Sequence, residues 1–336
     1  MKPTLPSACR AIGLAASALA LTALTACGPA APVGAQERPF TMYFVPSVEA
    51  DTIATNAEEL REFVEEYVGE ALYGDPSAFH VETAIPTSYV AVVEAFGTGR
   101  ADFAALNTFS YILAKDVKGY DVRALVSIVR GEGERSYKGQ VIVRADSGIE
   151  TLADLDGKKF AFTDPASTAG YLLPSKLLRD NGIEPAETTF AMKHDNVVSQ
   201  VYQGQVDAGA TYYSPPHTEE RDGETVEVIR DARARVLTQY PDVAEKVRIL
   251  GFTEETPNEP WVMRGDVYDD PTRQSELEVA VRDALLAFAV TPGGLEALDA
   301  LYDVTGLVAV DDTVYEDIRR IVREQGLDVE AAVADD

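Results

Sequence analysis

From residue 40 onward, short apolar segments alternate with amphipathic ones, and this alternation limits the fold more than any other feature of the sequence. Apolar runs typical of strands occupy residues 40–45, 79–85 and 102–106. Segments with apolar side chains at helical spacing, such as residues 56–70, lie between them. Strands that alternate with helices over short links form mainly parallel sheets covered by helices. The sequence therefore predicts an α/β fold.

A second cycle of the same kind follows two further predicted strands at residues 123–129 and 140–144. We expect strands and helices to alternate at 159–162 (strand), 170–180 (helix), 189–192 (strand), 197–203 (helix) and 206–211 (strand). The tail from 274 to 324 is predicted to be largely helical. A chain of 336 residues is long enough for two domains of about 100–200 residues each, so we expect two α/β lobes.

The N-terminus has the pattern of an export signal. Lys2 and Arg10 precede an apolar run at residues 11–20 that contains no acidic residue and is too short to span a membrane. The run ends in LTACG, in which small residues precede Cys27. This motif resembles a bacterial lipobox and predicts cleavage after residues 1–26 with lipidation of Cys27. The alternative is a plain signal peptide followed by an incidental cysteine.

Cysteine and apolar content agree with an exported, lipid-anchored chain. The second cysteine, Cys9, lies in the segment to be removed, so the mature chain would hold no disulfide. Residues 27–39 lack apolar periodicity and are interpreted as a flexible tether between lipid and domain. No later run of 18 apolar residues occurs, so membrane attachment is expected through the N-terminal lipid alone.

The charge balance excludes two classes of partner. The chain has 29 basic and 56 acidic side chains, a formal charge of −27. Removal of residues 1–26, with two basic and no acidic residues, gives −29. Nucleic acids and anionic membrane surfaces are bound through clustered Lys and Arg. The sequence therefore predicts neither as a partner.

One segment between a predicted strand and a predicted helix could bind an anion. Ser167, Thr168 and Ala169 stand where the helix after strand 159–162 begins. The first turn of a helix leaves backbone N–H groups without partners, and hydroxyl side chains add further donors. The alternative is that Ser167 or Thr168 merely caps the helix.

His194 follows the predicted strand at 189–192, and ligands of open α/β sheets bind beyond the carboxyl ends of strands. It could therefore reach the same crevice as Ser167, or be a structural histidine. An exported hydrolase with Ser167 as nucleophile and His194 as base is a further alternative. The sequence has no G-x-S-x-G motif and no phosphate-binding glycine loop. We expect no catalysis, no metal and no cofactor.

Several motifs together resemble one family. They are PTSY at 86–89, GRADFA at 99–104, DPASTAGYLLP at 164–174, HD at 194–195 and GQVDAGA at 204–210. In this order, after a lipobox, they are similar to the phosphate-, phosphite- and phosphonate-binding proteins of ABC importers.

The resemblance implies a two-lobed periplasmic-binding-protein fold of type II, with two crossovers and a ligand cleft between the lobes. Lobe one would comprise residues 40–142 and 256–336, and lobe two residues 143–255. The implied function is capture of phosphate, phosphite or a small phosphonate, outside the cytoplasm, for an ABC permease and its ATPase. A monomer is expected. The alternative is an input protein of a signalling system for a related oxyanion such as arsenite or arsenate.

The resemblance also implies site residues. The turn at 167–169 matches the family's oxyanion-binding helix start, Tyr89 a tyrosine that reaches the ligand from the other lobe, and His194 a histidine ligand. Glu259 matches an acidic residue on the return crossover. In the family this acid accepts a hydrogen bond from a protonated oxyanion or a ligand amine.

Two departures from the family pattern bear on the ligand. The segment after residue 102 lacks the usual aromatic and glycine, so the hydroxyl of Thr108 or Tyr111 is predicted to replace a lobe-one contact. The acid that aminoalkylphosphonate binders have close to Ser214 is missing, which argues against an aminophosphonate. Tyr212, Tyr213 and Trp261 are candidates for an aromatic wall or for holding a cation; the alternative is that they are buried packing residues. The proposed donors are neutral, and a set of this kind can hold a dianion without arginine.

Overall fold

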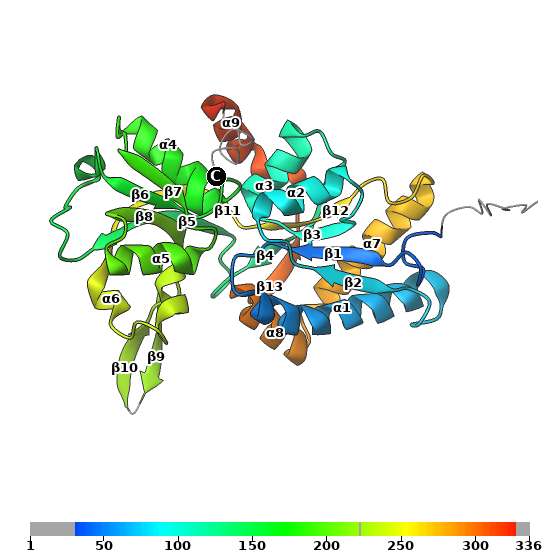
Figure 1. Cartoon of the computed structure of the whole chain (residues 1–336). Coiled ribbons are helices and arrows are strands. Elements are labelled where there is room, and N and C mark those ends of the chain that lie inside the picture. The colour runs from blue at the N-terminus through cyan, green and yellow to red at the C-terminus, as the bar shows by residue number, and fades with distance from the viewer. Residues whose placement is uncertain (1–30, 222, 327–336) are drawn as a thin grey trace, which may run out of the picture. The chain divides into compact units, whose positions relative to one another are not determined.

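The structure is a computed structural model that describes residues 31–221 and 223–326. A compact unit that holds the sheets begins at Pro32. The predicted signal peptide at residues 1–26 and the predicted lipidation site Cys27 lie outside the described residues. Within the described part, two sheets form the centres of two lobes, and a short hairpin extends from the second (Figure 1).

The first lobe is built on a six-stranded sheet in the order β13-β4-β12-β3-β1-β2. β1 is parallel to β2 and β3, while β12 enters antiparallel between β3 and β4. The strands are β1 (Phe40–Phe44), β2 (Val81–Ala84), β3 (Phe103–Ala105), β4 (Val122–Val129), β12 (Pro260–Arg264) and β13 (Gly306–Ala309). The strand β13 interrupts the tail that was predicted to be largely helical.

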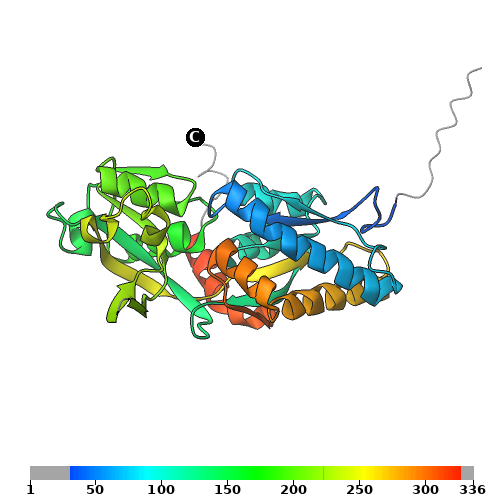
Figure 2. The ribbon, with the colours of Figure 1, turned by 90° about the horizontal axis from the view of Figure 1, so that it is seen from below.

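Helices cover both faces of this sheet. In Figure 1, α2 and α3 lie on one face and α1, α7 and α8 on the other; Figure 2 views the latter face. The helical elements of the lobe are α1 (Ala50–Tyr73), α2 (Tyr89–Gly97), α3 (Thr108–Ile112), η1 (Leu113–Val117), α7 (Pro271–Phe288), α8 (Pro292–Tyr302), η5 (Asp312–Tyr315) and α9 (Glu316–Gln325).

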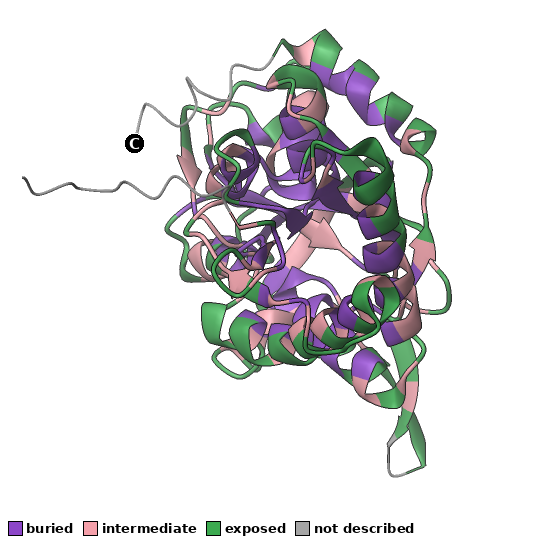
Figure 3. Cartoon of the chain, turned by 90° about the vertical axis from the view of Figure 1, so that its right-hand side faces the viewer, coloured by how far each residue is buried: buried purple, intermediate pink, exposed green. Residues whose placement is uncertain are grey.

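The longest helix, α1, illustrates why these segments are helical. Its buried side chains include Ile53, Leu60, Val64 and Val68, which recur on one face. The helix ends at Gly74, whose φ of 67° and N–H bond to the carbonyl of Glu70 form a left-handed cap. Figure 3 shows the result for the whole chain: buried residues concentrate on strands and inner helix faces.

The second lobe is built on a five-stranded sheet in the order β11-β5-β8-β6-β7. Here β5 runs antiparallel between β8 and β11, as β12 does in the first sheet. The strands are β5 (Ser136–Arg144), β6 (Lys159–Phe162), β7 (Glu187–Phe190), β8 (Ala208–Tyr213) and β11 (Val247–Pro257); β9 (His217–Arg221) and β10 (Glu224–Val228) form the hairpin. Its helical elements are η2 (Leu152–Leu155), η3 (Thr168–Leu172), α4 (Leu173–Asp180), α5 (His194–Gln203), η4 (Ala232–Val236) and α6 (Val243–Lys246).

The chain crosses between the lobes twice. The first crossover lies between β4 and β5, at residues 130–135, and the second between β11 and β12, at residues 258–259. The first comes earlier than the boundary expected after residue 142, because β5 pairs with β8 and β11 and so belongs to the second sheet. The second lies within a few residues of the expected boundary.

The segment predicted as a tether is in part packed. Val33 is only 1% exposed, and its carbonyl accepts a hydrogen bond of 2.7 Å from the Tyr268 hydroxyl. The carbonyl of Gly34 accepts another, of 2.8 Å, from the His80 N–H. Residues 32–39 are therefore part of the first lobe, which shortens the predicted tether from the C-terminal side.

Within residues 31–221 and 223–326, no single helix has the length and apolar composition needed to cross a membrane. The pair α7 and α8 passes that test together but is bent by 94°.

Candidate functional site

A pocket lies where parallel strands of both sheets end. Arg130 and Ser214 directly follow β4 and β8, and Ser47 and Ser167 lie in the loops after β1 and β6; all four line the pocket. This is the position in which α/β sheets bind ligands. The cavity has a volume of about 70 Å³, counted as the space open to the centres of water molecules.

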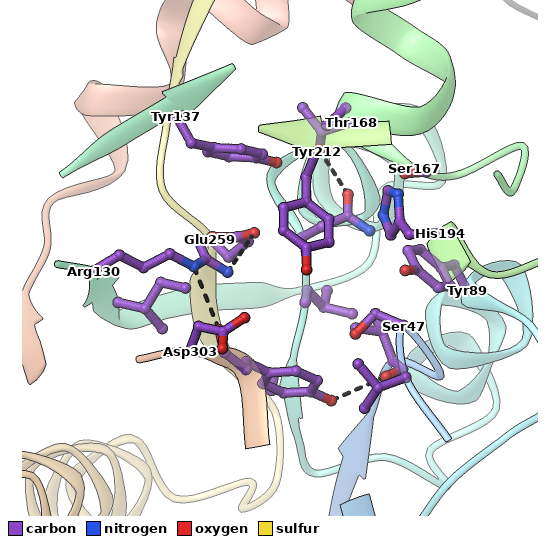
Figure 4. Close-up of a pocket in the computed structure, with 18 of the residues that line it drawn as sticks. Ser47, Tyr89, Arg130, Tyr137, Ser167, Thr168, His194, Tyr212, Glu259 and Asp303 are labelled. Atoms are coloured by element: carbon purple, nitrogen blue, oxygen red, sulfur yellow. Dashed lines mark hydrogen bonds and ion pairs between the residues drawn. The ribbon is translucent and has the colours of Figure 1, made fainter. Parts of the chain in front are cut away.

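The predicted anion turn forms one wall of this pocket (Figure 4). Ser167 precedes η3 as its N-cap, with an oxygen that accepts the Gly170 N–H at 3.1 Å, so its own proton stays available. Thr168 and Ala169 open η3, which continues directly into α4. The N–H groups of these first positions have no partner within the helix. They also stand at the positive end of its dipole.

The side chain of Thr168 has a different role from the one predicted. Its hydroxyl donates to Asn107 Oδ1 and accepts the Phe109 N–H, each at 2.8 Å. Asn107 and Phe109 belong to the first lobe and Thr168 to the second, so these bonds join the lobes. Thr168 can therefore offer its backbone N–H to a ligand, while its hydroxyl is already engaged.

His194 opens α5 and reaches the same pocket. Burial lowers the pKa of its imidazole to about 3, with a further contribution from the Arg130 and Arg235 charges. The ring is therefore neutral at ordinary pH and carries one proton. Its Nδ1 lies 3.1 Å from the Thr163 hydroxyl, which also lies 3.2 Å from the Ala210 carbonyl.

These two contacts determine which ring nitrogen carries the proton. A hydroxyl has a single proton, so Thr163 can donate to Ala210 and also bond His194 only if Nδ1 donates to it. We assign the proton to Nδ1 on this ground. The Nε2 atom is then a hydrogen-bond acceptor, whereas the sequence reasoning treated His194 as a donor.

Tyr89 lines the pocket from the first lobe and is 2% exposed. Burial and the nearby Asp164 carboxylate raise the pKa of its hydroxyl, so it remains a proton donor. Its backbone N–H donates to Asp164 Oδ2 of the second lobe at 3.1 Å. Burial raises the pKa of Asp164 to about 6, and the bonds from Ala166 and Tyr89 partly offset that rise.

Two arginines that the sequence reasoning did not anticipate also line the pocket. Arg130 binds both oxygens of Glu259, at 2.6 and 3.2 Å. Arg235 binds Asp303 at 2.6 Å and the Tyr212 hydroxyl at 3.4 Å. The expected acid Glu259 is thus present, but it is engaged by an arginine.

Of the three aromatic residues considered for a wall, Tyr212 and Trp261 line the pocket and Tyr213 is not among the lining residues. The Tyr212 ring stands edge-on to the His194 ring, with 5.0 Å between centroids. Burial raises the pKa of Tyr212 to about 12, so its hydroxyl is neutral. The rings of Trp261 and Tyr302 line the same pocket.

Of the predicted ligand-binding residues, the structure brings seven together at the pocket: Tyr89, Ser167, Thr168, Ala169, His194, Tyr212 and Glu259. Thr108 is not among the lining residues. It is fully buried and donates to the Pro257 carbonyl at 3.0 Å, because α3 packs beside the second crossover. The prediction for Thr108 is therefore corrected. Tyr111, its alternative, instead contacts Asp312.

Among the residues that sequence reasoning missed, Arg130 carried a usable signal. It follows the predicted strand 123–129 directly, at the edge where ligands bind. Arg235 and Asp303 carried none, since one lies in the short 3-10 helix η4 and the other directly follows α8. Their proximity depends on the packing of the two lobes.

The motif order, the two sheets with an inserted antiparallel strand, and the pocket at the strand ends agree with one family model. That model, the periplasmic substrate-binding protein of phosphonate ABC transporters, matches residues 42–315. The chain belongs to this family. Phosphonate-binding family members are transport proteins that bind substrate outside the cytoplasm, so membership argues against an enzyme. The predicted resemblance is confirmed.

A curated relative supports the same family. The curated "Phosphate-import protein PhnD" of Mycolicibacterium smegmatis is 28% identical over 217 residues, which are 60% of this chain and 64% of the relative. The match thus spans slightly less than two thirds of that relative's length.

Solved structures show the fold. A binding protein component of an ABC phosphonate transporter from Pseudomonas aeruginosa has a TM-score of 0.67 at 18% identity, covering 86% of this chain and 85% of that one. PhnD1 from Prochlorococcus marinus, in complex with methylphosphonate, has a TM-score of 0.68 at 17% identity, covering 85% and 98%. The predicted two-lobed, type II periplasmic-binding-protein fold is confirmed.

Proposed function

We propose that this phosphonate-binding family protein captures phosphate, phosphite or a small phosphonate and delivers it to an ABC permease with its ATPase. The observation that carries the proposal is the meeting of the 167–169 turn, Tyr89 and His194 in one small pocket. The relatives named for phosphate import and solved with methylphosphonate support the same ligand class.

The proposed contacts follow from the hydrogen-bond inventory. The N–H groups of Thr168 and Ala169 and the hydroxyls of Ser167 and Tyr89 donate to the phosphorus oxygens. His194 Nε2 accepts the proton of a P–OH group. A fixed acceptor rejects an oxyanion without a proton, because the acceptor and the anion would both present lone pairs. Phosphate therefore fits this set and sulfate does not.

Calorimetric titration with phosphate, phosphite, methylphosphonate and sulfate tests the proposal. We expect at least one phosphorus oxyanion to bind far more tightly than millimolar and sulfate to bind weakly. Ser167→Ala should weaken binding by about tenfold or more, since a buried charged hydrogen bond is worth about 1.5–3 kcal/mol. Ser147→Ala, which removes an exposed hydroxyl, is the matched control and should change nothing. Failure of all three phosphorus ligands to bind below millimolar would refute the ligand class.

Two further parts of the proposal have separate tests. Lipid anchoring predicts that the exported protein carries a lipid that Cys27→Ser removes, as detected by mass spectrometry of the N-terminal peptide. The importer role predicts that deletion of the gene abolishes growth on the bound compound as sole phosphorus source. Intact growth with a lost transcriptional response would instead favour the signalling alternative.

A further inference from the structure

The pocket contains two carboxylates, and both are engaged by arginine. Glu259 receives two bonds from Arg130, and Asp303 receives one from Arg235. Among the described residues, these are the four charged side chains that line the pocket, with His194 neutral. Their charges cancel, so the pocket offers no free carboxylate.

The Arg130 guanidinium is fixed in place from several sides. Besides its two bonds to Glu259, its Nε donates to the Tyr302 carbonyl at 3.4 Å, and it lies over the Tyr137 ring at 5.6 Å. The side chains of Arg130 and Glu259 are 14% and 17% exposed. A bidentate pair in a poorly hydrated place is hard to open, since each ion would lose its partner without regaining water.

The second pair is tied to the aromatic wall. Arg235 comes from η4 of the second lobe and Asp303 from the end of α8 in the first. Nε of Arg235 also donates to the Tyr212 hydroxyl, whose ring packs on His194. In Figure 4 the Arg130–Glu259 pair lies on one side of the Tyr212 ring, and His194, Ser167 and Tyr89 lie on the other.

An ammonium group on a ligand would gain little electrostatic binding energy in this pocket. It would meet a carboxylate whose charge is already balanced by a guanidinium a few ångströms away, so attraction and repulsion nearly cancel. It would still lose its water. An uncharged substituent carries no comparable desolvation cost.

We propose that Arg130 and Arg235 determine specificity: by occupying Glu259 and Asp303, they make the pocket select phosphorus oxyanions with an uncharged fourth substituent and reject those with an ammonium group. This inference rests on the proposed function. It goes beyond the acid missing near Ser214, because it explains why the acids that are present do not bind an amine.

Two ligands of equal size separate charge from shape. Ethylphosphonate and aminomethylphosphonate have the same number of non-hydrogen atoms, with a methyl group in one where the other has an ammonium. Calorimetry on the wild-type protein, at a mildly acidic pH at which both phosphonates keep a P–OH group, should show ethylphosphonate binding at least about tenfold more tightly. Equal affinities, or a preference for the amine, would overturn the inference and leave the proposed function intact.

Variants of Arg130 and Glu259 then test whether Arg130 causes the preference for ethylphosphonate over aminomethylphosphonate. Arg130→Met keeps the length of the side chain and frees Glu259, so the preference for ethylphosphonate should fall by about tenfold or reverse. Arg130→Lys retains the charge and should retain the preference. Glu259→Gln added to Arg130→Met should abolish the gained amine binding. An unchanged preference in a folded Arg130→Met protein would overturn the role of Arg130.

Because Arg130 lies at the first crossover, its loss could prevent folding. Arg235→Met, which frees Asp303 instead, provides a second test with the same expected shift, and circular dichroism verifies the fold of each variant. If the wild-type protein binds phosphate or phosphite but neither methylphosphonate nor ethylphosphonate, this inference fails and the proposed function stands. If it binds none of these phosphorus oxyanions, both fail.

Discussion

At the scale of single residues, His194 shows how a second contact changes what a side chain offers a ligand. The histidine itself was predicted from its place after a strand. Its role as an acceptor depends on Thr163, whose hydroxyl lies between His194 Nδ1 and the Ala210 carbonyl. Thr163 directly precedes the motif at 164–174, and only the folded chain shows that it contacts the imidazole.

Replacement of Thr163 tests this assignment. Thr163→Val keeps the shape but removes the acceptor of the Nδ1 proton, so the proton should move to Nε2. We expect phosphate binding about tenfold weaker, within the roughly 1–3 kcal/mol cost of a mismatched buried polar group, and poorer discrimination against sulfate. Nitrogen NMR shifts of the His194 ring report the tautomer. Thr163→Ser should restore the wild-type signals, and an Nε2-protonated ring in the wild type would contradict the assignment.

The pKa of His194 gives a second expectation at this scale. Since burial and the two arginines hold it at about 3, the ring stays neutral from about pH 5 to 8. The affinity should therefore follow the ionisation of the ligand and show no transition near the usual histidine pKa. Titrations of phosphate and methylphosphonate over this range measure it. A shared transition near pH 6.5 in both ligands would indicate a histidine that titrates.

Asp164 gives a prediction for stability. Its pKa is raised from the usual 3.8 to about 6, so the folded protein binds more protons than the unfolded chain between those values. The stability contribution of this group thus falls as pH rises through that window, and above pH 6 the protein carries a buried charge. Relative to wild type, Asp164→Asn should gain about 1 kcal/mol between pH 5 and 7.5. Urea unfolding of both proteins at the two pH values measures this; a constant difference would contradict it.

At the scale of elements, strand–turn–helix units were predictable because their signals are local. β6 and α4 fall within the segments predicted at 159–162 and 170–180, and η3 begins two residues before the second segment. The hairpin of β9 and β10 was missed, because its strands are mostly polar and exposed and so lack an apolar pattern. Strand β12 was also missed, although its apolar residues form the centre of the first sheet.

The features of the candidate site also divide into those that local sequence signals predict and those that they do not. The 167–169 turn, Tyr89 and His194 were predicted, since each stands at the start of an element and has a matching motif. The bonds of Thr168 to the first lobe and the arginine pairs were not predicted. They join residues that are far apart in the sequence, as Arg235 and Asp303 are, and no local pattern records such a contact.

The position of η3 depends on Gly170. A Cβ added there would lie 2.3 Å from the Thr163 hydroxyl oxygen and 2.9 Å from the Ser167 oxygen. Gly170→Ala should therefore lower the free energy of unfolding by about 1–3 kcal/mol and weaken ligand binding, since both hydroxyls belong to the site. Denaturant unfolding and calorimetry measure the two effects.

Gly306→Ala is the control for this substitution. Its nearest neighbour, Cβ of Val129, would lie 3.8 Å away, an ordinary contact. We expect little change in either measurement. Equal effects of the two alanines would contradict the steric explanation.

At the scale of the whole molecule, the proposed binding of an anion by a protein of charge −27 depends on the pocket's own balance of charge. Donors in the pocket are neutral, and the two arginines are offset by two carboxylates. The acidic surface repels the ligand at long range, and salt screens that repulsion. Binding thus depends on contacts made within the pocket.

Salt should therefore affect binding little, and in a defined direction. Between about 0.05 and 0.5 M sodium chloride we expect the affinity for phosphate to change less than about threefold and to rise if it changes. Calorimetry at several salt concentrations measures this. A steep loss of affinity with salt would show that unpaired positive charge attracts the ligand.

The packing of Val33 against the first lobe has a consequence for how the molecule would sit at a membrane. A lipid on Cys27 would be separated from the packed unit at Pro32 by five residue steps, a reach of about 17 Å even when fully extended. The protein would then stay close to the bilayer, and its orientation relative to the membrane would be restricted. This short linker would determine from which side a permease can approach the pocket.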